Sequence, residues 1–411
     1  MLSKWIGCQR TIRNAKVDEA LYLRWLRSRA IFNNIPVTTG YFDQSYLQFK
    51  TKINPWLKEV PSQILRNGIY RAKRAYVRYW AGVGAVPVRK LKSTTESVLI
   101  TSELFQIRSG NLFLGSKTKA VKIAFNPHRE FGDPKMITIT RAIDEWYVSF
   151  TSSDDTVVPT NEACIQKNIL VCDDEIVAID RGVINPLYDS NGCNYNLSRK
   201  VEKKIEQLEC KVEKFQRELH KHKIGSKRRN RTKNKLAKAH QKKRRVILDW
   251  RHKVSYSIAS SDCKVVVVED LKLVNMTKAP AAKPQTPVGV YPTNGAAAKA
   301  VLNRSMLKMG LGHVVTLLEY KLNRRGKALV RVNPRCSSQE CSQCGHVHKD
   351  NRPTQDEFHC QSCGFKANAD YNAALVLRKR GYAFLQSAVA IGNMETLNAQ
   401  WALGPPEKHP A

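Results

Sequence analysis

The hydrophobic pattern changes along the chain, and each part predicts a different kind of structure. Residues 17–82 carry apolar and aromatic side chains at the three- and four-residue spacing of amphipathic helices. Residues 98–172 contain short β-branched runs, such as KAVKIAF and KMITITRA, broken by Gly, Asn and Pro. This pattern predicts helices first and then a small antiparallel barrel or sandwich. The Pro-, Ala- and Gly-rich segment 276–298 predicts a loop.

Two unbroken apolar runs further on predict strands that are buried on both faces. The run IVAID ends at Asp180 and VVVVED reaches Glu269. RGVINPLYDSNG, directly after Asp180, predicts a hairpin return, and Asp370 opens the helical segment ADYNAALVL. A strand with a hairpin return, a later buried strand ending in Glu and a final helix opening with Asp outline the RNase H-like fold. The three carboxylates are expected to meet at the strand ends.

Three adjacent carboxylates repel one another unless cations neutralise them. Mg²⁺ prefers oxygen ligands and keeps positions open for water and phosphate, and two such ions ~4 Å apart support phosphodiester hydrolysis. Taken singly, each acid could be a helix cap or a strand-end residue, and Asp370 could simply N-cap its helix. Asp270 competes with Glu269, which we prefer because it directly ends the apolar run.

The cysteines divide into a patterned group and a scattered group. Of 11 cysteines, four form the spacing C-x2-C-x15-C-x2-C, at Cys341, Cys344, Cys360 and Cys363. Each pair is followed by a glycine, which permits the tight turn that aims two thiolates at one ion. This spacing predicts a structural zinc site, and the scattered remainder is not a disulfide framework, so an intracellular protein is expected.

The region between the two buried strands is strongly basic. The whole chain has 69 Lys and Arg against 35 Asp and Glu, a formal charge of +34. Residues 199–253 hold 22 Lys and Arg against 6 Asp and Glu, in two helices whose first carries a narrow apolar seam. Such an excess predicts a nucleic-acid partner more than a solvated surface. The candidate contacts in this hairpin are Lys227, Arg228, Arg229, Arg231, Arg244 and Arg245.

A membrane partner is the alternative for so basic a chain, but no run of ~18 apolar residues exists to span a bilayer. The N-terminus has no apolar signal-peptide core, although its basic composition leaves a transit peptide open.

Several motifs, in order, resemble the transposon-encoded TnpB family of RNA-guided endonucleases, which are related to compact type V CRISPR effectors. They are AIDRGV, VVVVEDLKLVNM, LNRSMLKMG, LEYKLNRRG, SSQECSQCG, FHCQSCGFKANADYNAALVL and METLNAQ. The upstream segments LRSRAIFNN and PWLKEVPSQILRNGIYRAKRAYVRYW match more weakly. The N-terminus is shorter than is usual in the family, which puts part of its barrel in doubt.

The resemblance implies a multidomain α/β protein with an RNase H-like RuvC nuclease domain and an inserted zinc ribbon. The implied order is a short N-terminal wedge segment (1–16), a helical recognition domain (17–95), a β-barrel wedge domain (96–172), a nuclease domain (173–334) containing the basic hairpin 199–253, a zinc ribbon (335–367), the end of the nuclease domain (368–385) and a disordered tail (386–411).

It also implies a catalytic site of Asp180, Glu269 and Asp370 with two Mg²⁺ ions. A guide RNA would lie on basic surfaces, and Ser62, Gln63 and Arg66 would help to read a short motif beside the double-stranded DNA target. We expect a monomer in the prokaryotic cytoplasm, near the nucleoid. Three alternatives stay open: a nuclease-inactive RNA-guided repressor, a strand-joining transposase and a CRISPR effector.

Overall fold

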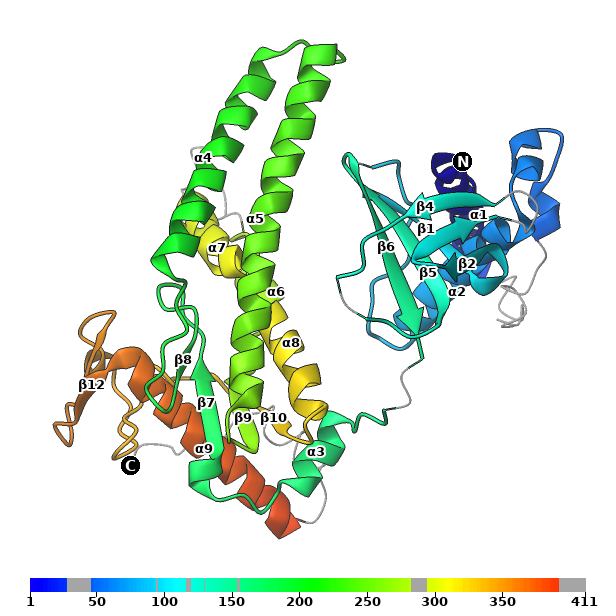
Figure 1. Cartoon of the computed structure of the whole chain (residues 1–411). Coiled ribbons are helices and arrows are strands. Elements are labelled where there is room, and N and C mark those ends of the chain that lie inside the picture. The colour runs from blue at the N-terminus through cyan, green and yellow to red at the C-terminus, as the bar shows by residue number, and fades with distance from the viewer. Residues whose placement is uncertain are drawn as a thin grey trace. The chain divides into compact units, whose positions relative to one another are not determined.

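The chain divides into two compact units, Met1–Thr156 (unit 1) and Val157–Ala411 (unit 2). The computed structural model (Figure 1) describes residues 1–27, 46–93, 95–115, 120–128, 130–153, 156–281 and 294–391. The motif METLNAQ, part of LRSRAIFNN and most of the predicted loop 276–298 lie outside these residues. Each unit is described by itself.

Unit 1 consists of helices followed by strands, as its hydrophobic pattern predicts. Its helical elements are α1 (Leu2–Arg27), η3 (Tyr46–Phe49), η4 (Pro55–Glu59), α2 (Ser62–Trp80) and η5 (Ser102–Leu104). Its strands are β1 (Thr95–Thr101), β2 (Phe105–Arg108), β3 (Asn111–Leu114), β4 (Val121–Ala124), β5 (Pro134–Ala142) and β6 (Glu145–Ser152). They pair as two antiparallel sheets, β1-β5-β6 and β2-β3-β4. The predicted barrel stays a prediction.

One apolar core joins the helices of unit 1 to both sheets. Ile12 of α1 and Ile64 of α2 are fully buried in it together with Ile100 of β1 and Leu114 of β3. Helix α1 continues without a break across position 16, where the sequence predicted a domain boundary. Its buried face extends past that position to Val17, so the packing continues there.

A four-stranded sheet in the order β10-β9-β7-β8 forms the centre of unit 2. Its strands are β7 (Ile176–Asp180), β8 (Tyr188–Asp189), β9 (Val265–Glu269) and β10 (Ala328–Val332). The strands β7, β9 and β10 are parallel, and β8 runs antiparallel to β7. The predicted hairpin return and both buried strands are therefore confirmed.

Alternation along these strands explains the layers of unit 2, because successive side chains point to opposite faces of a sheet. Val177 and Val266 pack with α5 (Lys227–Ser260) and α8 (Leu311–Asn323) on one face. Ala178 and Val267 pack with α3 (Asn161–Lys167) and α9 (Ala369–Ile391) on the other. The sheet thus lies between two layers of helices.

The remaining elements of unit 2 are short or are inserted between the strands. They are η6 (Asp173–Glu175), α4 (Arg199–Lys221), α6 (Leu273–Met276), α7 (Ala296–Met309), η7 (Lys349–Asn351), β11 (Glu357–His359) and β12 (Lys366–Asn368). Helices α4 and α5 form the long basic hairpin between β8 and β9 (Figure 1). The predicted seam is confirmed where Ile205, Leu208 and Val212 are buried.

Two helix ends are set by local contacts. Helix α5 begins at Lys227, because the hydroxyl of Ser226 caps it by accepting from the N–H of Arg229 at 3.1 Å. Helix α9 continues through the first residues of the predicted tail to Ile391, because Leu385 and Ala388 are buried against the sheet. Residues 392–411 lie outside the described part. No helix in the described ranges is long and apolar enough to cross a membrane.

Candidate active site and metal centre

Two of the predicted acids end neighbouring parallel strands at the same edge of the sheet. Ile179 of β7 is paired with Val268 of β9, so the next residues, Asp180 and Glu269, leave the sheet side by side. Glu269 is buried, whereas Asp270 is exposed and its N–H donates to the carbonyl of Val332 at 2.8 Å. Of the two adjacent acids, Glu269 therefore faces the interior.

The third acid, Asp370, lies in the first turn of α9 and is also buried. It does not cap that helix with its side chain, because the Oδ1 of Asn368 accepts from the N–H groups of both Asp370 and Tyr371 at 3.1 Å. The Oδ2 of Asp370 instead accepts from Nδ2 of Asn185 at 2.8 Å. Its Oδ1 lies 3.2 Å from Nη2 of Arg352.

The pKa of Asp180 shows that the three carboxylates act on one another. Burial and then the negative charges of Glu269 and Asp370 raise this pKa to about 7, and the positive charge of Arg352 opposes the rise. Burial also raises the pKa of Glu269, and the hydrogen bond from Ser337 opposes that rise. Such buried, mutually repelling carboxylates are expected where a cation binds, since their charges are poorly compensated by the protein.

Polar neighbours hold these acids in place. The hydroxyl of Ser337 donates to Oε1 of Glu269 at 2.8 Å, and both residues are buried. The guanidinium of Arg181 donates to the backbone carbonyl of Glu269, which ties the end of β7 to the end of β9. The Oδ1 of Asn185 accepts from the side-chain amides of Asn194 at 3.2 Å and Asn196 at 3.1 Å, so its Nδ2 remains directed at Asp370.

Asp189 is a buried carboxylate in the same region with a structural role. Its Oδ1 accepts from the N–H groups of Asn191 and Cys193, and its Oδ2 accepts from the Tyr195 hydroxyl at 2.8 Å. These bonds stabilise the loop after β8 and occupy both oxygens. Asp189 therefore does not belong to the group of available carboxylates.

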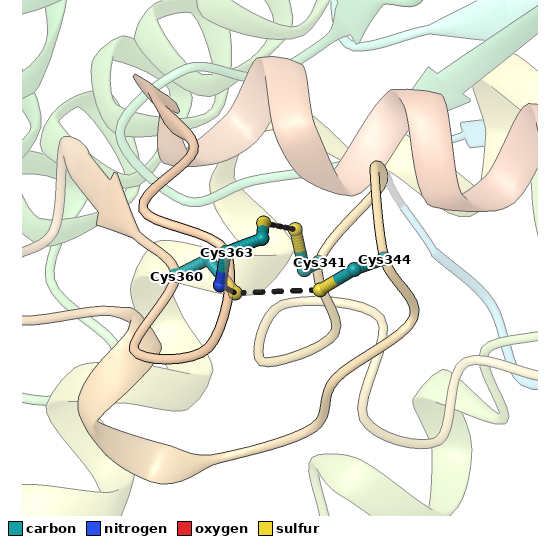
Figure 2. Close-up of side chains that lie close together, drawn as sticks. All are labelled: Cys341, Cys344, Cys360 and Cys363. Carbon is teal, nitrogen blue, oxygen red and sulfur yellow. Dashed lines mark hydrogen bonds between the residues drawn. The ribbon is translucent and has the colours of Figure 1, made fainter.

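The four predicted cysteines meet in one cluster (Figure 2). The sulfurs of Cys341 and Cys363 lie 3.7 Å apart, and those of Cys344 and Cys360 lie 3.6 Å apart. Four sulfurs placed tetrahedrally ~2.3 Å from one Zn²⁺ would be ~3.8 Å from one another, whereas a disulfide would bring two of them to ~2 Å. The cluster therefore has the geometry of a zinc site.

The two cysteine pairs adopt the same local conformation. In the first, the carbonyl of Cys341 accepts from the N–H of Gly345 at 2.9 Å. In the second, the carbonyl of Cys360 accepts from the N–H of Gly364 at 3.1 Å. Both glycines have positive φ, +75° and +73°, which other residues rarely adopt. Among the described residues, these cysteines form the one group of three or more potential metal ligands whose ligand atoms all lie within 4.8 Å of one another.

Two buried asparagines connect the cysteine cluster to the carboxylates. The Nδ2 of Asn351 donates to the carbonyls of Gln339 and His346, and its Oδ1 accepts from the N–H of Gln361. The Oδ1 of Asn372, two residues after Asp370, accepts from the N–H of Ser342 at 2.9 Å. The cluster thus places Arg352, directly after Asn351, against Asp370.

Sequence reasoning missed the residues that support the acids: Asn185, Ser337, Asn351, Arg352 and Asn372. Each is a single polar residue, and their spacing along the chain carries no period. Only proximity to a motif could have suggested them: Arg352 lies between the cysteine pairs and Asn185 lies in the predicted hairpin.

The predicted nucleic-acid contacts lie at two places. Ser62, Gln63 and Arg66 occupy the first turns of α2 in unit 1, where Arg66 pairs with Glu103 at 2.9 Å. In unit 2, Lys227, Arg228, Arg231, Arg244 and Arg245 are exposed along α5. Arg229 differs from these, because its guanidinium donates to the carbonyls of Leu219 and His222 at the end of α4.

Parts of the chain match known families, and the chain is similar to two curated proteins. Residues 171–279 match the family described as "Probable transposase", and residues 312–377 match the "Cas12f1-like, TNB domain" family. The "Putative RNA-guided DNA endonuclease InsQ" of Escherichia coli is 27% identical over 333 residues, covering 80% of this chain and 77% of that protein. A "Putative RNA-guided DNA endonuclease" of Streptomyces pristinaespiralis is 24% identical over 397 residues, covering 93% and 86%.

The fold also resembles that of a solved structure. It is the cryo-EM structure of a Cas12f1–sgRNA–target DNA complex, with a TM-score of 0.55, 14% identity, and coverage of 91% of this chain and 81% of that chain. At this identity the likeness concerns the fold alone.

Proposed function

With its resemblance to the TnpB family confirmed by these relatives, we propose that the chain is an RNA-guided DNA endonuclease. It would bind a guide RNA and cleave complementary double-stranded DNA beside a short adjacent motif, by Mg²⁺-dependent hydrolysis at one site. The observation that carries the proposal is that Asp180 and Glu269 leave neighbouring strands side by side, and that the charges of Glu269 and Asp370 both raise the pKa of Asp180.

The order of strands in unit 2 supports an RNase H-like, RuvC-type domain. The first strand, β7, pairs with β8 as a hairpin and with the parallel strand β9, which in turn pairs with β10; the acids end β7 and β9. The last acid follows on the helix that covers the sheet. The ends of parallel strands are a common place for functional side chains in α/β sheets, because they meet at one edge.

The carboxylate set fits Mg²⁺ by its chemistry. It offers oxygen ligands and no nitrogen or sulfur ligand, and its buried negative charges need a counter-charge. Three carboxylates can be shared between two cations, the arrangement that supports phosphodiester hydrolysis with two ions. When bound, such ions would activate water and stabilise the leaving oxygen of a phosphodiester.

The residues of the chain itself would prepare this site. Asn185 donates to one oxygen of Asp370 and Arg352 to the other, and Ser337 donates to one oxygen of Glu269. These bonds restrict the side-chain rotamers, so the acids are positioned before the substrate arrives. Arg352 also supplies a positive charge at a place where a phosphate would approach.

The cysteine cluster is proposed to hold Zn²⁺ as a structural zinc ribbon between β10 and α9. All-cysteine sites keep no open ligand position, so the cluster would take no part in hydrolysis. Its role would be to order the segment that presents Arg352 to Asp370 and to hold nucleic acid near the site.

In the test, the protein is expressed from its native locus and purified together with any RNA that it retains. The RNA is sequenced, and the complex is incubated with Mg²⁺ and DNA that matches the RNA's 3′ end, with Asp180→Ala as the inactive control. Cleavage that requires the match and disappears in the variant is the expected result. Guided binding without cleavage would indicate a repressor, and the absence of any discrete RNA would contradict guidance. A neighbouring repeat array in the DNA would identify a CRISPR effector.

A further inference from the structure

Unit 1 contains a basic cavity that no predicted site residue lines. Its volume is about 310 Å³, and it lies between α1, α2 and the segment 90–97 that leads into β1. Arg10, Arg13, Arg71 and Lys90 contribute four positive charges to its lining, against one negative charge from Glu96. The formal charge of this lining is therefore +3.

The single acid of the cavity is already neutralised. Glu96 pairs with Arg10 and, at 2.9 Å, with Arg141 of β5. Its side chain is only 8% exposed, which indicates that both pairs are well shielded from solvent. It therefore offers little compensation to the other three cations.

Arg13 and Arg71 are held in the cavity by neutral groups. Arg71 donates to Oε1 of Gln9 at 3.0 Å and to the carbonyl of Ser97 at 2.8 Å. Arg13, which is 7% exposed, donates to the carbonyl of Val88 at 3.0 Å. These bonds fix the direction of each guanidinium without cancelling its charge. In the described part of unit 1, neither forms an ion pair with a carboxylate.

Lys90 completes the group at the exposed mouth of the cavity. Its backbone is tied to Asn14, whose Oδ1 accepts from the N–H of Lys90 and whose Nδ2 donates to its carbonyl, each at 2.9 Å. Within the described residues, no hydrogen bond or ion pair involves its ammonium group. These bonds fix the backbone of Lys90 at the cavity, and the residue forms part of the same lining as Arg13 and Arg71.

The cations destabilise one another in this arrangement. Burial and then the charge of Arg13 lower the pKa of Arg71, and burial followed by the charges of Arg71 and Arg13 lowers the pKa of Lys90. An anion between them would offset both effects. Guanidinium groups favour planar, bidentate contact with the oxygens of phosphate, and an ammonium adds a point charge.

We propose that this cavity binds one backbone phosphate of a nucleic-acid strand. The choice of a nucleic acid as the source of the phosphate rests on the proposed function, whereas the anion site itself rests on the cavity alone. A built-in phosphate site in unit 1 would fix the register of the bound strand, since phosphate contacts position a nucleic acid without reading its sequence.

The test compares the full-length protein with Lys90→Gln and with the matched control Lys92→Gln, which removes an exposed charge outside the cavity lining. Inorganic phosphate is titrated against chloride at constant ionic strength while the melting temperature is measured. Phosphate should raise the melting temperature of the wild type and of Lys92→Gln, and raise that of Lys90→Gln clearly less. Without phosphate, Lys90→Gln should melt no lower than the wild type, because it relieves repulsion. If Lys90 only stabilised the fold, Lys90→Gln would melt lower than the wild type without phosphate and would gain as much from phosphate as the wild type does.

A second arm measures the affinity of the same proteins for a labelled single-stranded RNA at several salt concentrations. For Lys90→Gln, loss of one phosphate contact should reduce the slope of log affinity against log salt concentration by about 0.7. Binding should weaken about fivefold near 0.1 M salt. A phosphate effect without an RNA effect would overturn the nucleic-acid assignment, and equal losses in both variants would overturn the site. Failure of guided cleavage with an intact Lys90 effect would count against the proposed function only.

Discussion

The guanidinium of Arg352 lies 3.2 Å from the Oδ1 of Asp370, although the two residues belong to different structural parts. Arg352 comes from the segment between the cysteine pairs, and Asp370 begins the helix that covers the sheet. This ion pair is buried, with both side chains less than one-fifth exposed, so it is shielded from solvent. It makes the geometry of the carboxylate site depend on the order of the cysteine cluster.

Arg352→Gln should shift the acidic limb of the cleavage–pH profile upward. Burial and the charges of Glu269 and Asp370 raise the pKa of Asp180 to about 7, and Arg352 opposes that rise. Loss of its charge raises this pKa further, so more of Asp180 is protonated below neutrality. At Mg²⁺ concentrations below saturation, protons compete with the cation for Asp180. Under that condition we expect roughly tenfold slower cleavage at mildly acidic pH for a shift of one pKa unit, and a smaller loss at alkaline pH. Arg378→Gln is the matched control. Arg378 lies on α9, the helix of Asp370, but pairs with Asp173, so its loss should leave the cleavage–pH profile unchanged.

The metal-free protein should become less stable as the pH rises towards neutrality and above it. Asp180 has an ordinary pKa of 3.8 and a folded-state pKa of about 7. Its protonated form favours the folded state, so its contribution is complete below pH 3.8 and is lost as the pH rises through 7. The loss is at most about 4 kcal/mol. Mg²⁺ should therefore raise the melting temperature more at pH 8 than at pH 6, and Asp180→Asn should remove most of that difference. An equal Mg²⁺ effect at both pH values would contradict this linkage.

Cys344→Ser should abolish stoichiometric zinc binding and slow cleavage strongly. A structural four-cysteine site cannot hold its ion when one thiolate is missing, and the segment carrying Arg352 would lose its order. Elemental analysis by mass spectrometry measures the zinc, and a cleavage assay measures the activity. Cys210→Ser, an exposed cysteine of α4, is the control and should retain both. Retention of zinc in Cys344→Ser would show that the ion is held elsewhere.

Gly381→Ala should destabilise unit 2 by roughly 1–3 kcal/mol, the usual cost of an overpacked core. Gly381 lies in α9, and a Cβ added there would overlap the side chain of Val267 in the central strand β9. Denaturant unfolding monitors the change. Val267→Ala in the same chain should recover part of the loss because it makes room for the added methyl group, and strictly additive losses would argue against a direct overlap.

Arg228 and Arg229 should differ although they are neighbours of the same type. Arg229 donates to the carbonyls at the end of α4, so Arg229→Gln should lower the melting temperature by removing a bond worth about 1 kcal/mol. Arg228 is exposed, so Arg228→Gln should leave the melting temperature unchanged and reduce the salt dependence of RNA binding. Thermal melts and salt-dependent affinities of both variants test this distinction, and identical effects on both quantities would contradict it.

The sequence by itself determined the features that local pattern encodes. Unbroken apolar runs identified the strands ending in Asp180 and Glu269, because a strand buried on both faces tolerates no polar residue. Repeated CxxC spacing identified the four cysteines, since two tight turns suffice to direct their thiolates. Helical periodicity found α4 and α5, although the start of α5 depended on the cap at Ser226.

Only the tertiary structure decided which residues surround these motifs. Asn185 reaches Asp370 across 185 positions, and Ser337 reaches Glu269 across 68. Hydrogen bonds of such separation leave no period in the chain, and a single polar residue in a loop has many alternative partners. The cavity formed by Arg13, Arg71 and Lys90 arises for the same reason, because packing of α1 against α2 brings together cations that the sequence keeps apart. Local preference acts through neighbours along the chain, whereas these sites depend on the burial of distant segments against one another.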